Sequence, residues 1–263
     1  MYAFKDGKTF KCSSCKKRFS VRVGSIFQDS NIPLRKWFMA IYLITNHKKG
    51  ISSVQLAKDI GVTQKTSWFM LHRLRHESKR TVFNQFQGTV EADECYVGGS
   101  ETNKHTIKKF TSEKAVVFGL VNRETKQVKS FNVDNADKEC LLPKIGCSVK
   151  AGSNVITDSY HAYKDLKNNY NHDVIKHSAG EYVIIDDNRD AFKIHTNTIE
   201  GYWALVKRTI NGTYHWVSKK HLQNYLCECD FRYNTKEVEI ESERFDCFLQ
   251  SKSSKLSYKT LIA

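Results

Sequence analysis

The stretch GTVEADECYVGG, Gly88 to Gly99, decides the fold of this chain. Its apolar residues Val90, Ala92 and Val97 alternate with polar positions, a pattern that predicts a β-strand. Before this stretch the apolar residues recur at helical spacing, whereas KAVVFGLVNRETKQVKSFNVD after it predicts two more strands around a turn near residues 122–126. A helical segment therefore gives way to a sheet at about residue 88.

The rest of the chain adds helices and further strands to these three. ADKECLLPKI predicts a short helix, SNVITD a buried strand that ends in Asp158, SYHAYKDLK a helix, and HDVIKH another strand. The last long helix begins in NTIEGYWALVKRTI, Asn197 to Ile210. Three strands followed by alternating helices and strands predict an α/β fold with a mixed sheet.

The charges are distributed unevenly along the 263 residues. Residues 1–87 hold 17 Lys and Arg against 4 Asp and Glu, whereas the remainder holds 25 against 24. A basic segment beside a nearly neutral one is typical of a docking module for a polyanion joined to a part with another role. Nucleic acid is the first candidate for that polyanion.

Composition also restricts the cellular location that we expect. The start, MYAFKDGKTFK, is charged where a secretory signal would be apolar. The longest apolar run, Trp37 to Ile44, is too short to span a bilayer. The eight cysteines lack the dense spacing of a small secreted domain, which favours reduced thiols. We expect a cytoplasmic, nucleoid-associated protein with no membrane partner.

Residues 1–30 contain a candidate metal-binding knuckle. FKCSSCKKRF, residues 10–19, places Cys12 and Cys15 in a C-x-x-C motif that is typical of one half of a zinc ribbon. Tetrahedral zinc needs four ligands, and residues 1–11 supply no further Cys or His. A free thiol pair and a partial zinc ribbon, completed by a segment upstream, both remain open.

Residues 31–87 have the pattern of a helix-turn-helix module. An apolar helix over Leu34 to His47 precedes two shorter ones, and Ser52 or Ser53 can cap the first of these. Gly61 breaks it, and Thr63 can cap the next helix, which extends through Arg75. An ordinary helical hairpin would show the same pattern, but the basic surroundings favour DNA binding. The second helix is then expected to present outward Gln64, Lys65, Ser67 and Arg73.

Three acids of the α/β segment fall where chemistry could occur: Asp93 in the first strand, Asp158 at the end of a strand, and Glu200 near the start of the last helix. Carboxylates at strand ends suit divalent cations, and two such ions about 4 Å apart can clamp the oxygens of a phosphoryl transfer. Each acid also has an ordinary interpretation. Asp93 could face water on an edge strand, Asp158 could cap a helix, and Asn197 with Glu200 could form a capping box.

The helix that begins at Asn197 favours the chemical interpretation. At 100° per residue, Glu200 and Lys207 flank the predicted buried stripe. Their spacing of seven does not suit a mutual ion pair, which prefers three or four. A metal-facing carboxylate and a lysine for DNA phosphate fit the two-turn spacing better. The stripe itself consists of Ile199, Trp203, Val206 and Ile210.

These motifs together resemble those of the ISXO-like bacterial insertion-sequence transposases. The resemblance rests on GTVEADECYVGG, VITDSYHAY, HTNTIEGYWALVKRTINGTYHWVSKKHLQNYLCECDFRYN and the capped helices upstream, and it extends from about Lys11 to Asn234. It implies a zinc ribbon and a helix-turn-helix module before an RNase H-like catalytic domain of the DDE type. The family's zinc ribbon has two cysteine knuckles. This chain departs from that pattern, because it keeps only the knuckle of Cys12 and Cys15.

The resemblance also implies roles for individual residues. Asp93 and Asp158 match the first two metal-binding acids, Glu200 is the preferred third, and Asn197 is its alternative. The implied cofactor is Mg²⁺ or Mn²⁺, with Zn²⁺ if the ribbon is completed. Lys207 and Arg208 would contact DNA. The implied activity is binding of terminal inverted repeats in double-stranded DNA, followed by cleavage and strand transfer by a homodimer or higher oligomer.

The expected organisation is therefore a knuckle at 1–30, a helix-turn-helix module at 31–87, an RNase H-like domain at 88–234 and a C-terminal tail at 235–263. Two other functions stay open. One is a DNA-binding regulator with a non-catalytic α/β domain, in which Asp93 and Asp158 would be dispensable. The other is an inactive, truncated transposase.

Overall fold

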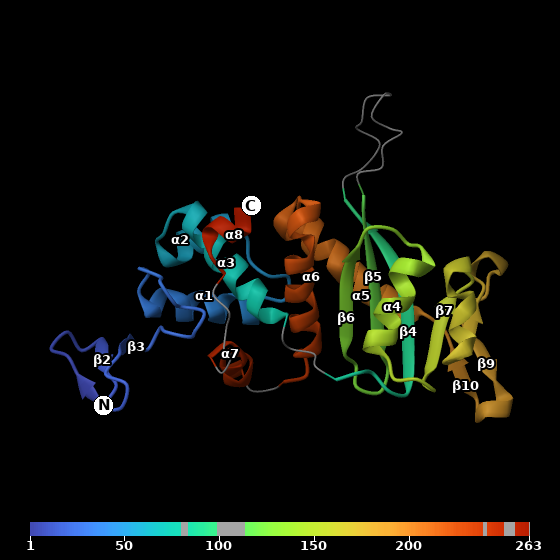
Figure 1. The fold of residues 1–263 in the computed structure, drawn as a ribbon. Coiled ribbons are helices and arrows are strands. Elements are labelled where there is room, and N and C mark those ends of the chain that lie inside the picture. Colours follow the sequence, from blue (N-terminus) through green and yellow to red (C-terminus); the bar gives the residue numbers. More distant parts are fainter. Residues whose placement is uncertain (80–83, 99–113, 239–240, 250–255, 263) are drawn as a thin grey trace. The chain divides into compact units, whose positions relative to one another are not determined.

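The computed structural model describes residues 1–79, 84–98, 114–238, 241–249 and 256–262 and divides the chain into two compact units (Figure 1). We call Met1–Arg80 together with Glu237–Ala263 the basic unit, and Thr81–Lys236 the sheet unit. Among the described helices, none combines the length and apolar character that crossing a membrane requires.

A five-stranded mixed sheet forms the centre of the sheet unit, with strand order β6-β5-β4-β7-β8 (Figure 1). The first three strands in this order are antiparallel, and β4, β7 and β8 are parallel. This confirms the mixed α/β fold and is compatible with an RNase H-like domain. The strands are β4 (Thr89–Val97), β5 (Ala115–Asn122), β6 (Val128–Val133), β7 (Asn154–Asp158) and β8 (Asn171–Ile175).

Helices cover both faces of this sheet. On one face, α4 (Lys138–Ser148) and the 3-10 helix η3 (His161–Asn168) pack against side chains such as Val90 and Phe118. On the other face, α5 (Asn197–Thr209) and α6 (Lys219–Asn234) pack against Val117 and Val121. Successive strand residues point to opposite faces, which is why neighbouring residues of β5 enter different cores.

Short elements complete the sheet unit. Strands β9 (Ile184–Asp186) and β10 (Phe192–Ile194) form an antiparallel pair just before α5. The turn η4 (His177–Ala179) precedes this pair, and η5 (Asp187–Arg189) lies between its two strands. The π-helix η6 (Ile210–Tyr214) continues α5. The predicted stripe of α5 is confirmed, because its four members are all buried: Ile199, Trp203, Val206 and Ile210.

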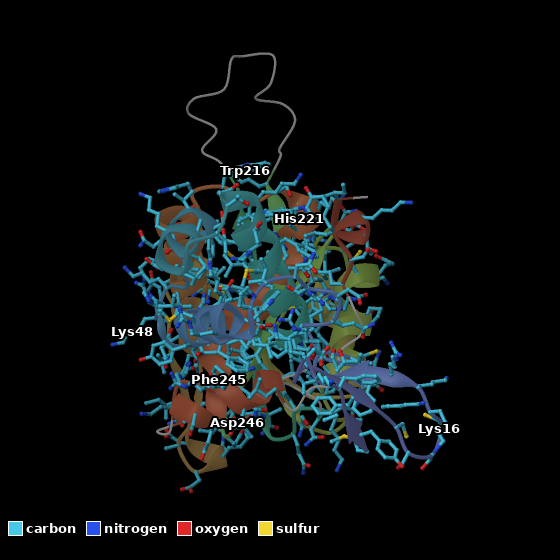
Figure 2. All side chains as sticks on the ribbon, turned by 90° about the vertical axis from the view of Figure 1, so that its left-hand side faces the viewer. Lys16, Lys48, Trp216, His221, Phe245 and Asp246 are labelled. Carbon is cyan, nitrogen blue, oxygen red and sulfur yellow. The ribbon has the colours of Figure 1, made fainter. Side chains whose placement is uncertain are left out.

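The basic unit begins with a small antiparallel sheet of β1 (Tyr2–Ala3), β2 (Thr9–Lys11) and β3 (Arg18–Ser20). Figure 2 shows Lys16, in the turn between β2 and β3, and Lys48, after α1, pointing into solvent. Three helices follow: α1 (Leu34–Asn46), α2 (Ser53–Ile60) and α3 (Gln64–Ser78).

Caps define the turn between α2 and α3. The Ser52 hydroxyl accepts a hydrogen bond from the Gln55 N–H at 3.2 Å, and the Thr63 hydroxyl accepts one from the Thr66 N–H at 3.2 Å. Gly61 ends α2 with φ at 62°, a left-handed conformation in which a side chain is strained. Both helices therefore begin where the capping residues predict.

The C-terminal residues differ from the predicted tail. They form α7 (Glu241–Leu249) and α8 (Tyr258–Ile262), which belong to the basic unit. The Phe245 ring packs edge-on against Phe38 at 5.7 Å, and Tyr258 against Phe69 at 5.5 Å. The sequence does not predict these helices, because a short helix held by a few aromatic rings has little apolar periodicity of its own.

Candidate active site

The two predicted aspartates lie on neighbouring strands. Strands β4 and β7 are parallel and pair Glu91 with Ile156, so the same register, continued by two residues, sets Asp93 beside Asp158. Both side chains are half-buried, and the Asp158 carboxylate accepts a hydrogen bond from the Tyr160 N–H at 3.0 Å. Because β4 is the central strand, the interpretation of Asp93 as a solvated edge residue is wrong.

The surroundings of Asp93 disfavour the ionised form of its carboxyl group. Burial raises the pKa of Asp93 to about 6, and the charges of Asp158 and Glu200 act in the same direction. Hydrogen bonds from the Glu94 N–H and the Trp203 indole oppose this rise. Three carboxylates that repel one another form a site that favours a cation or a proton.

A close approach between sheet and helix holds Asp93. The Trp203 indole N–H of α5 donates to Asp93 Oδ2 at 3.0 Å. Gly119 pairs with Asp93 across β4 and β5, and a Cβ atom there would lie 2.5 Å from the Trp203 ring. Gly119 is therefore required for the indole to reach the aspartate.

The start of α5 differs from the predicted capping box. Thr196, rather than Asn197, is the N-cap, and its hydroxyl donates to Glu200 Oε1 at 3.1 Å. The His177 Nε2 atom lies 3.5 Å from the same carboxylate oxygen. Glu200 keeps about half of its side chain exposed, and Asn197 is exposed as the first helical residue. Both candidates for the third group therefore remain accessible.

The carboxylate that caps α5 comes from β4, and our sequence analysis does not predict it. Glu91 is fully buried, and its Oε2 accepts hydrogen bonds from the N–H groups of Thr198 at 2.9 Å and Ile199 at 3.0 Å. Its Oε1 accepts from Arg123 Nε at 2.6 Å. A buried anion at a helix N-terminus satisfies orphan donors and complements the helix dipole. Glu91 thereby fixes α5 relative to the strand that carries Asp93.

Arg123 extends this network to the segment before α5. Its guanidinium donates to the carbonyl oxygens of Lys193 at 2.5 Å and His195 at 2.7 Å. The His195 ring also lies beside Glu91, with Nδ1 at 3.3 Å from Oε1. Strand alternation could have indicated that Glu91 shares a face with Asp93, but its partners lie more than 30 residues away.

Glu94 is a further acid at this end of β4. Its pKa is raised to about 7, mainly by burial, and the charges of Asp93 and Asp158 contribute to this rise while the nearby Tyr163 hydroxyl opposes it. Tyr163 belongs to the core on the α4 side of the sheet. Glu94 therefore adds negative potential behind the predicted site when it is ionised.

The acids suit a hard divalent cation in their chemistry. Mg²⁺ prefers carboxylate oxygens, and a cation would relieve the repulsion that raises the pKa of Asp93. The best placed donors are Asp93, Asp158 and Glu200. Within the described residues, no three potential ligand side chains stand close enough to hold an ion as they are placed. The donor types therefore fit such an ion, although the side chains as placed do not enclose one.

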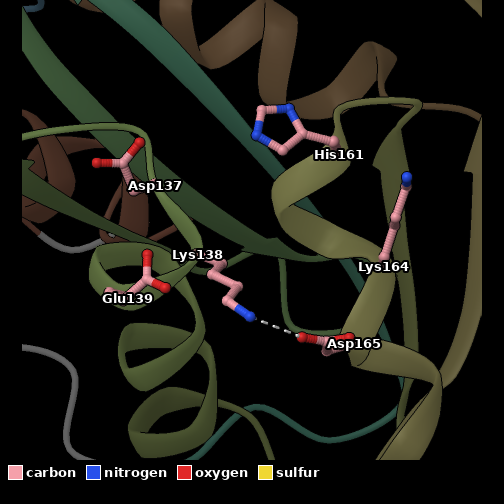
Figure 3. Close-up of a pocket in the computed structure, with 6 residues that line it drawn as sticks. All are labelled: Asp137, Lys138, Glu139, His161, Lys164 and Asp165. Carbon is pink, nitrogen blue, oxygen red and sulfur yellow. Dashed lines mark hydrogen bonds and ion pairs between the residues drawn. The ribbon is translucent and has the colours of Figure 1, made fainter.

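A separate hollow of about 390 Å³ lies between the start of α4 and η3 (Figure 3). Its charges largely cancel, and Lys138 reaches Asp165 at 3.5 Å. It therefore offers little net attraction to a phosphate. The lining residues are Asp137, Lys138, Glu139, His161, Lys164 and Asp165.

Comparison with known proteins identifies the family. Residues 85–234 match the ISXO2-like transposase domain, which is more than half of the chain. The chain belongs to the ISXO2-like transposase family.

Two relatives have names that agree with this family. An uncharacterized protein in transposable element ISH50 of Halobacterium salinarum is 27% identical over 234 residues, which cover 82% of this chain and 75% of the relative. An uncharacterized transposase-like protein of Haemophilus influenzae is 31% identical over 116 residues, which cover 44% of this chain and 87% of the relative.

Towards the end of α5, the two basic residues predicted for this transposase-family domain are accessible. Lys207 and Arg208 are exposed. Lys207 lies beside Cys95 of β4, where burial raises the pKa of the thiol and the lysine charge lowers it. Helix α5 therefore follows strand β4, with Glu200 near the start of the helix and Lys207 two turns later.

The predicted DNA contacts on α3 need correction. Gln64 and Lys65 are exposed at the start of the helix, but Ser67 and Arg73 are buried. The Ser67 hydroxyl bonds to the Ser53 carbonyl of α2, and Arg73 donates to the Gln28 carbonyl at 2.9 Å. Ser67 shares a helix face with the buried apolar residues Met70, Leu71 and Leu74.

The cysteine knuckle of the transposase-family chain lies between β2 and β3. The N–H groups of Cys15 and Ser14 point at the Cys12 sulfur and lower its pKa, which favours the thiolate that zinc requires. Around Cys12 and Cys15, the described residues supply no third or fourth ligand. The pair is therefore suited to metal binding but incomplete by itself.

Proposed function

We propose that this chain is an insertion-sequence transposase that cleaves DNA at the ends of its element and joins them to target DNA. The observation that carries the proposal is the placement of Asp93 beside Asp158, with the Glu200 charge also acting on the pKa of Asp93. Membership in the transposase family supports it. So does the name of the halobacterial relative, a protein in a transposable element.

Asp93, Asp158 and Glu200 would hold Mg²⁺ or Mn²⁺, with Asn197 as the alternative third group. A bound ion of this kind activates an oxygen nucleophile and neutralises the negative charge of the reacting phosphate in the transition state. The chain itself contributes position: Glu91 fixes the start of α5, and Trp203 orients the Asp93 carboxylate. Lys207 and Arg208, both exposed, would neutralise phosphates next to the reacting one.

The basic unit would bind the terminal inverted repeats. With α7 and α8 included, it holds 21 Lys and Arg against 9 Asp and Glu, whereas the sheet unit holds 21 against 19. The α2 and α3 pair would act as a helix-turn-helix with Gln64 and Lys65 as contacts. Cys12 and Cys15 would bind Zn²⁺ once two further ligands are supplied. Because two ends must be joined, the active form would be a dimer or higher oligomer on DNA.

The test is cleavage and strand transfer on labelled DNA that carries the element's own ends, with Mg²⁺ or Mn²⁺. We expect metal-dependent products from the unmodified chain and none from Asp158→Asn or Glu200→Gln. The exposed acid Asp165 provides the matched control, since Asp165→Asn should retain activity. If Glu200→Gln is active and Asn197→Ala is not, Asn197 is the third group.

Two results would contradict the proposal. DNA binding without metal-dependent cleavage by the unmodified chain would favour a regulator. Cleavage that persists in Asp158→Asn would place the chemistry elsewhere in the molecule. Salt dependence of binding provides a second check, because phosphate neutralisation makes affinity fall steeply with salt.

A further inference from the structure

A hollow of about 520 Å³ lies in the sheet unit where β4 and α5 end. Its volume lies in the range of small-molecule and cofactor sites. One of its lining residues is an exposed aromatic ring, Trp216 at 70%. Two others are the exposed lysines Lys114 and Lys207. Nothing in the proposed cleavage chemistry requires this ring.

The backbone holds Trp216 in this exposed position. His215, the residue after the π-helix η6, has φ at 61° and ψ at −46°. The Trp216 N–H donates to the Tyr214 carbonyl at 2.6 Å, so the three residues form a γ-turn of the strained, positive-φ type. Strained residues and π-helical turns concentrate at functional sites. Figure 2 shows the Trp216 side chain at the surface.

The hollow lies in line with the predicted catalytic acids. Helix α5 and strand β4 run in the same direction, because Trp203 meets Asp93 and Lys207 lies beside Cys95. Tyr96 is three residues beyond Asp93, or about 10 Å along the strand. Lys207 is two turns beyond Glu200, also about 10 Å. A DNA strand held at the acids would therefore reach the hollow within a few nucleotides.

The chemistry of the hollow matches a single nucleotide. An aromatic ring can stack on the face of any base, and lysines attract the phosphates on either side. Inside a duplex, neighbouring bases cover both faces of each base, so a ring can stack on an internal base only after that base leaves the helix. We propose that the hollow binds an unpaired DNA nucleotide next to the cleaved phosphate, with its base on Trp216. This inference rests on the proposed function for the choice of DNA.

The experiment compares the binding of two labelled DNAs to the full-length chain by fluorescence anisotropy, in Ca²⁺ to limit cleavage. One DNA is a blunt duplex of the element's end, and the other is the same duplex with three unpaired nucleotides at the cleavage site. We expect Trp216→Ala to weaken binding of the second DNA by about tenfold to a hundredfold and to leave the blunt duplex within about twofold. Trp216→Phe, which keeps a ring, should retain most of the affinity.

Ile185→Ala on β9 is the matched control, because Ile185 is also an exposed apolar residue of the sheet unit, at 56%. It should leave both affinities unchanged. Equal losses for the two DNAs in Trp216→Ala, or no loss, would overturn the inference. A change in oligomeric state with an unchanged preference for unpaired DNA would also overturn it and assign the hollow to contacts between copies.

Failure of the proposed function would look different. The binding comparison needs no cleavage, so Asp158→Asn should keep the preference for unpaired nucleotides. A chain without metal-dependent cleavage but with a Trp216-dependent preference would contradict the transposase proposal and support the nucleotide site. A chain that cleaves DNA and has no such preference would contradict the site and support the transposase proposal.

Discussion

The basic unit and the sheet unit use their charges in different ways. In the basic unit, basic side chains such as Lys16, Lys48 and Lys65 are exposed. In the sheet unit the two signs nearly balance, and several charged groups are buried, including Glu91, Glu228 and Asp230. The basic unit exposes an excess of one sign, although it also buries Arg73, Arg75 and Glu77. The sheet unit has no such excess and encloses individual charges among specific partners.

This difference separates two physical roles. Exposed charges act collectively over roughly a Debye length, and the loss of one of them changes little. Buried charges depend on particular partners, so the removal of one partner leaves a strongly destabilised group. We therefore expect substitutions in the sheet unit to have large and specific effects, and those on the surface of the basic unit to have small and additive ones.

The largest effect is expected for Asp93→Asn. Removing this carboxylate should slow metal-dependent cleavage by at least about 10⁴-fold, because several kcal/mol of transition-state stabilisation depend on the ions. Single-turnover cleavage of end-labelled DNA measures the rate. Affinity for the same DNA should stay within about twofold. A parallel loss of affinity would contradict the proposal that the basic unit binds the DNA and the sheet unit cleaves it.

The next effect concerns the buried cap of α5. Glu91→Ala should lower the free energy of unfolding of the sheet unit by about 3–5 kcal/mol, because it removes the charge partner of Arg123 and leaves its Nε and two backbone N–H groups without their acceptor. Urea denaturation and amide exchange in α5 measure it. The control is Asp165→Ala, which breaks an exposed pair and should cost at most about 1 kcal/mol. Equal costs would contradict the contrast.

Gly119→Ala tests the close approach that orients Asp93. The added methyl group would meet the Trp203 ring, so we expect a loss of about 1–3 kcal/mol in unfolding free energy and slower cleavage. Gly146 of α4 has no atom within 4 Å of an added Cβ, and Gly146→Ala should stabilise by up to about 1 kcal/mol. A neutral Gly119→Ala would show that the indole can move without consequence.

The pH dependence of stability should report Asp230. Burial raises its pKa from 3.8 to about 7, although the Tyr202 and Ser130 hydroxyls and the Ser130 N–H donate to it. Because the folded-state pKa is the higher one, the contribution of this group is fully present below pH 3.8. It is lost as pH rises through about 7, by at most about 1.4 kcal/mol per pH unit.

Asp230→Asn should remove this component. The difference in unfolding free energy between the unmodified chain and the variant should then fall between pH 4 and pH 7 and level off above. Urea denaturation at a series of pH values measures it. A difference that is constant with pH would mean that Asp230 does not titrate in this window.

The smallest effects are expected on α3. Lys65→Ala should weaken DNA binding severalfold and reduce the salt slope by about 1, because one exposed phosphate contact is lost. Ser67→Ala should leave DNA binding unchanged and cost about 1 kcal/mol of stability through its hydrogen bond to Ser53. Anisotropy titrations at several salt concentrations distinguish the two. Equal losses of affinity would restore Ser67 as a DNA contact.

Local patterns predicted much of the fold. Alternation in residues 115–133 predicted β5 and β6 with their turn, and the SNVITD run predicted β7 with Asp158 at its end. Ser52 and Thr63 predicted the starts of α2 and α3. These features succeed because caps, turns and alternation depend on residues only a few positions apart.

Other features could not be predicted because they depend on distant partners. Helical spacing predicts Ser67 and Arg73 on an exposed face, but packing against α2 and the segment around Gln28 buries them. The residues after 235 were expected to form a tail, yet Phe245 and Tyr258 attach them to the helices of the basic unit. Each contact joins residues far apart in the sequence.

The sequence by itself determined the alternating strands, the capped helices, the uneven charge and the three acids that resemble a transposase site. Those signals are local or compositional, so the chain carries them before it folds. The tertiary structure decided which acids meet, that Glu91 caps α5, and that Gly119 admits the Trp203 ring to Asp93. Strand register and helix packing fix these distances, and no spacing along the sequence contains them.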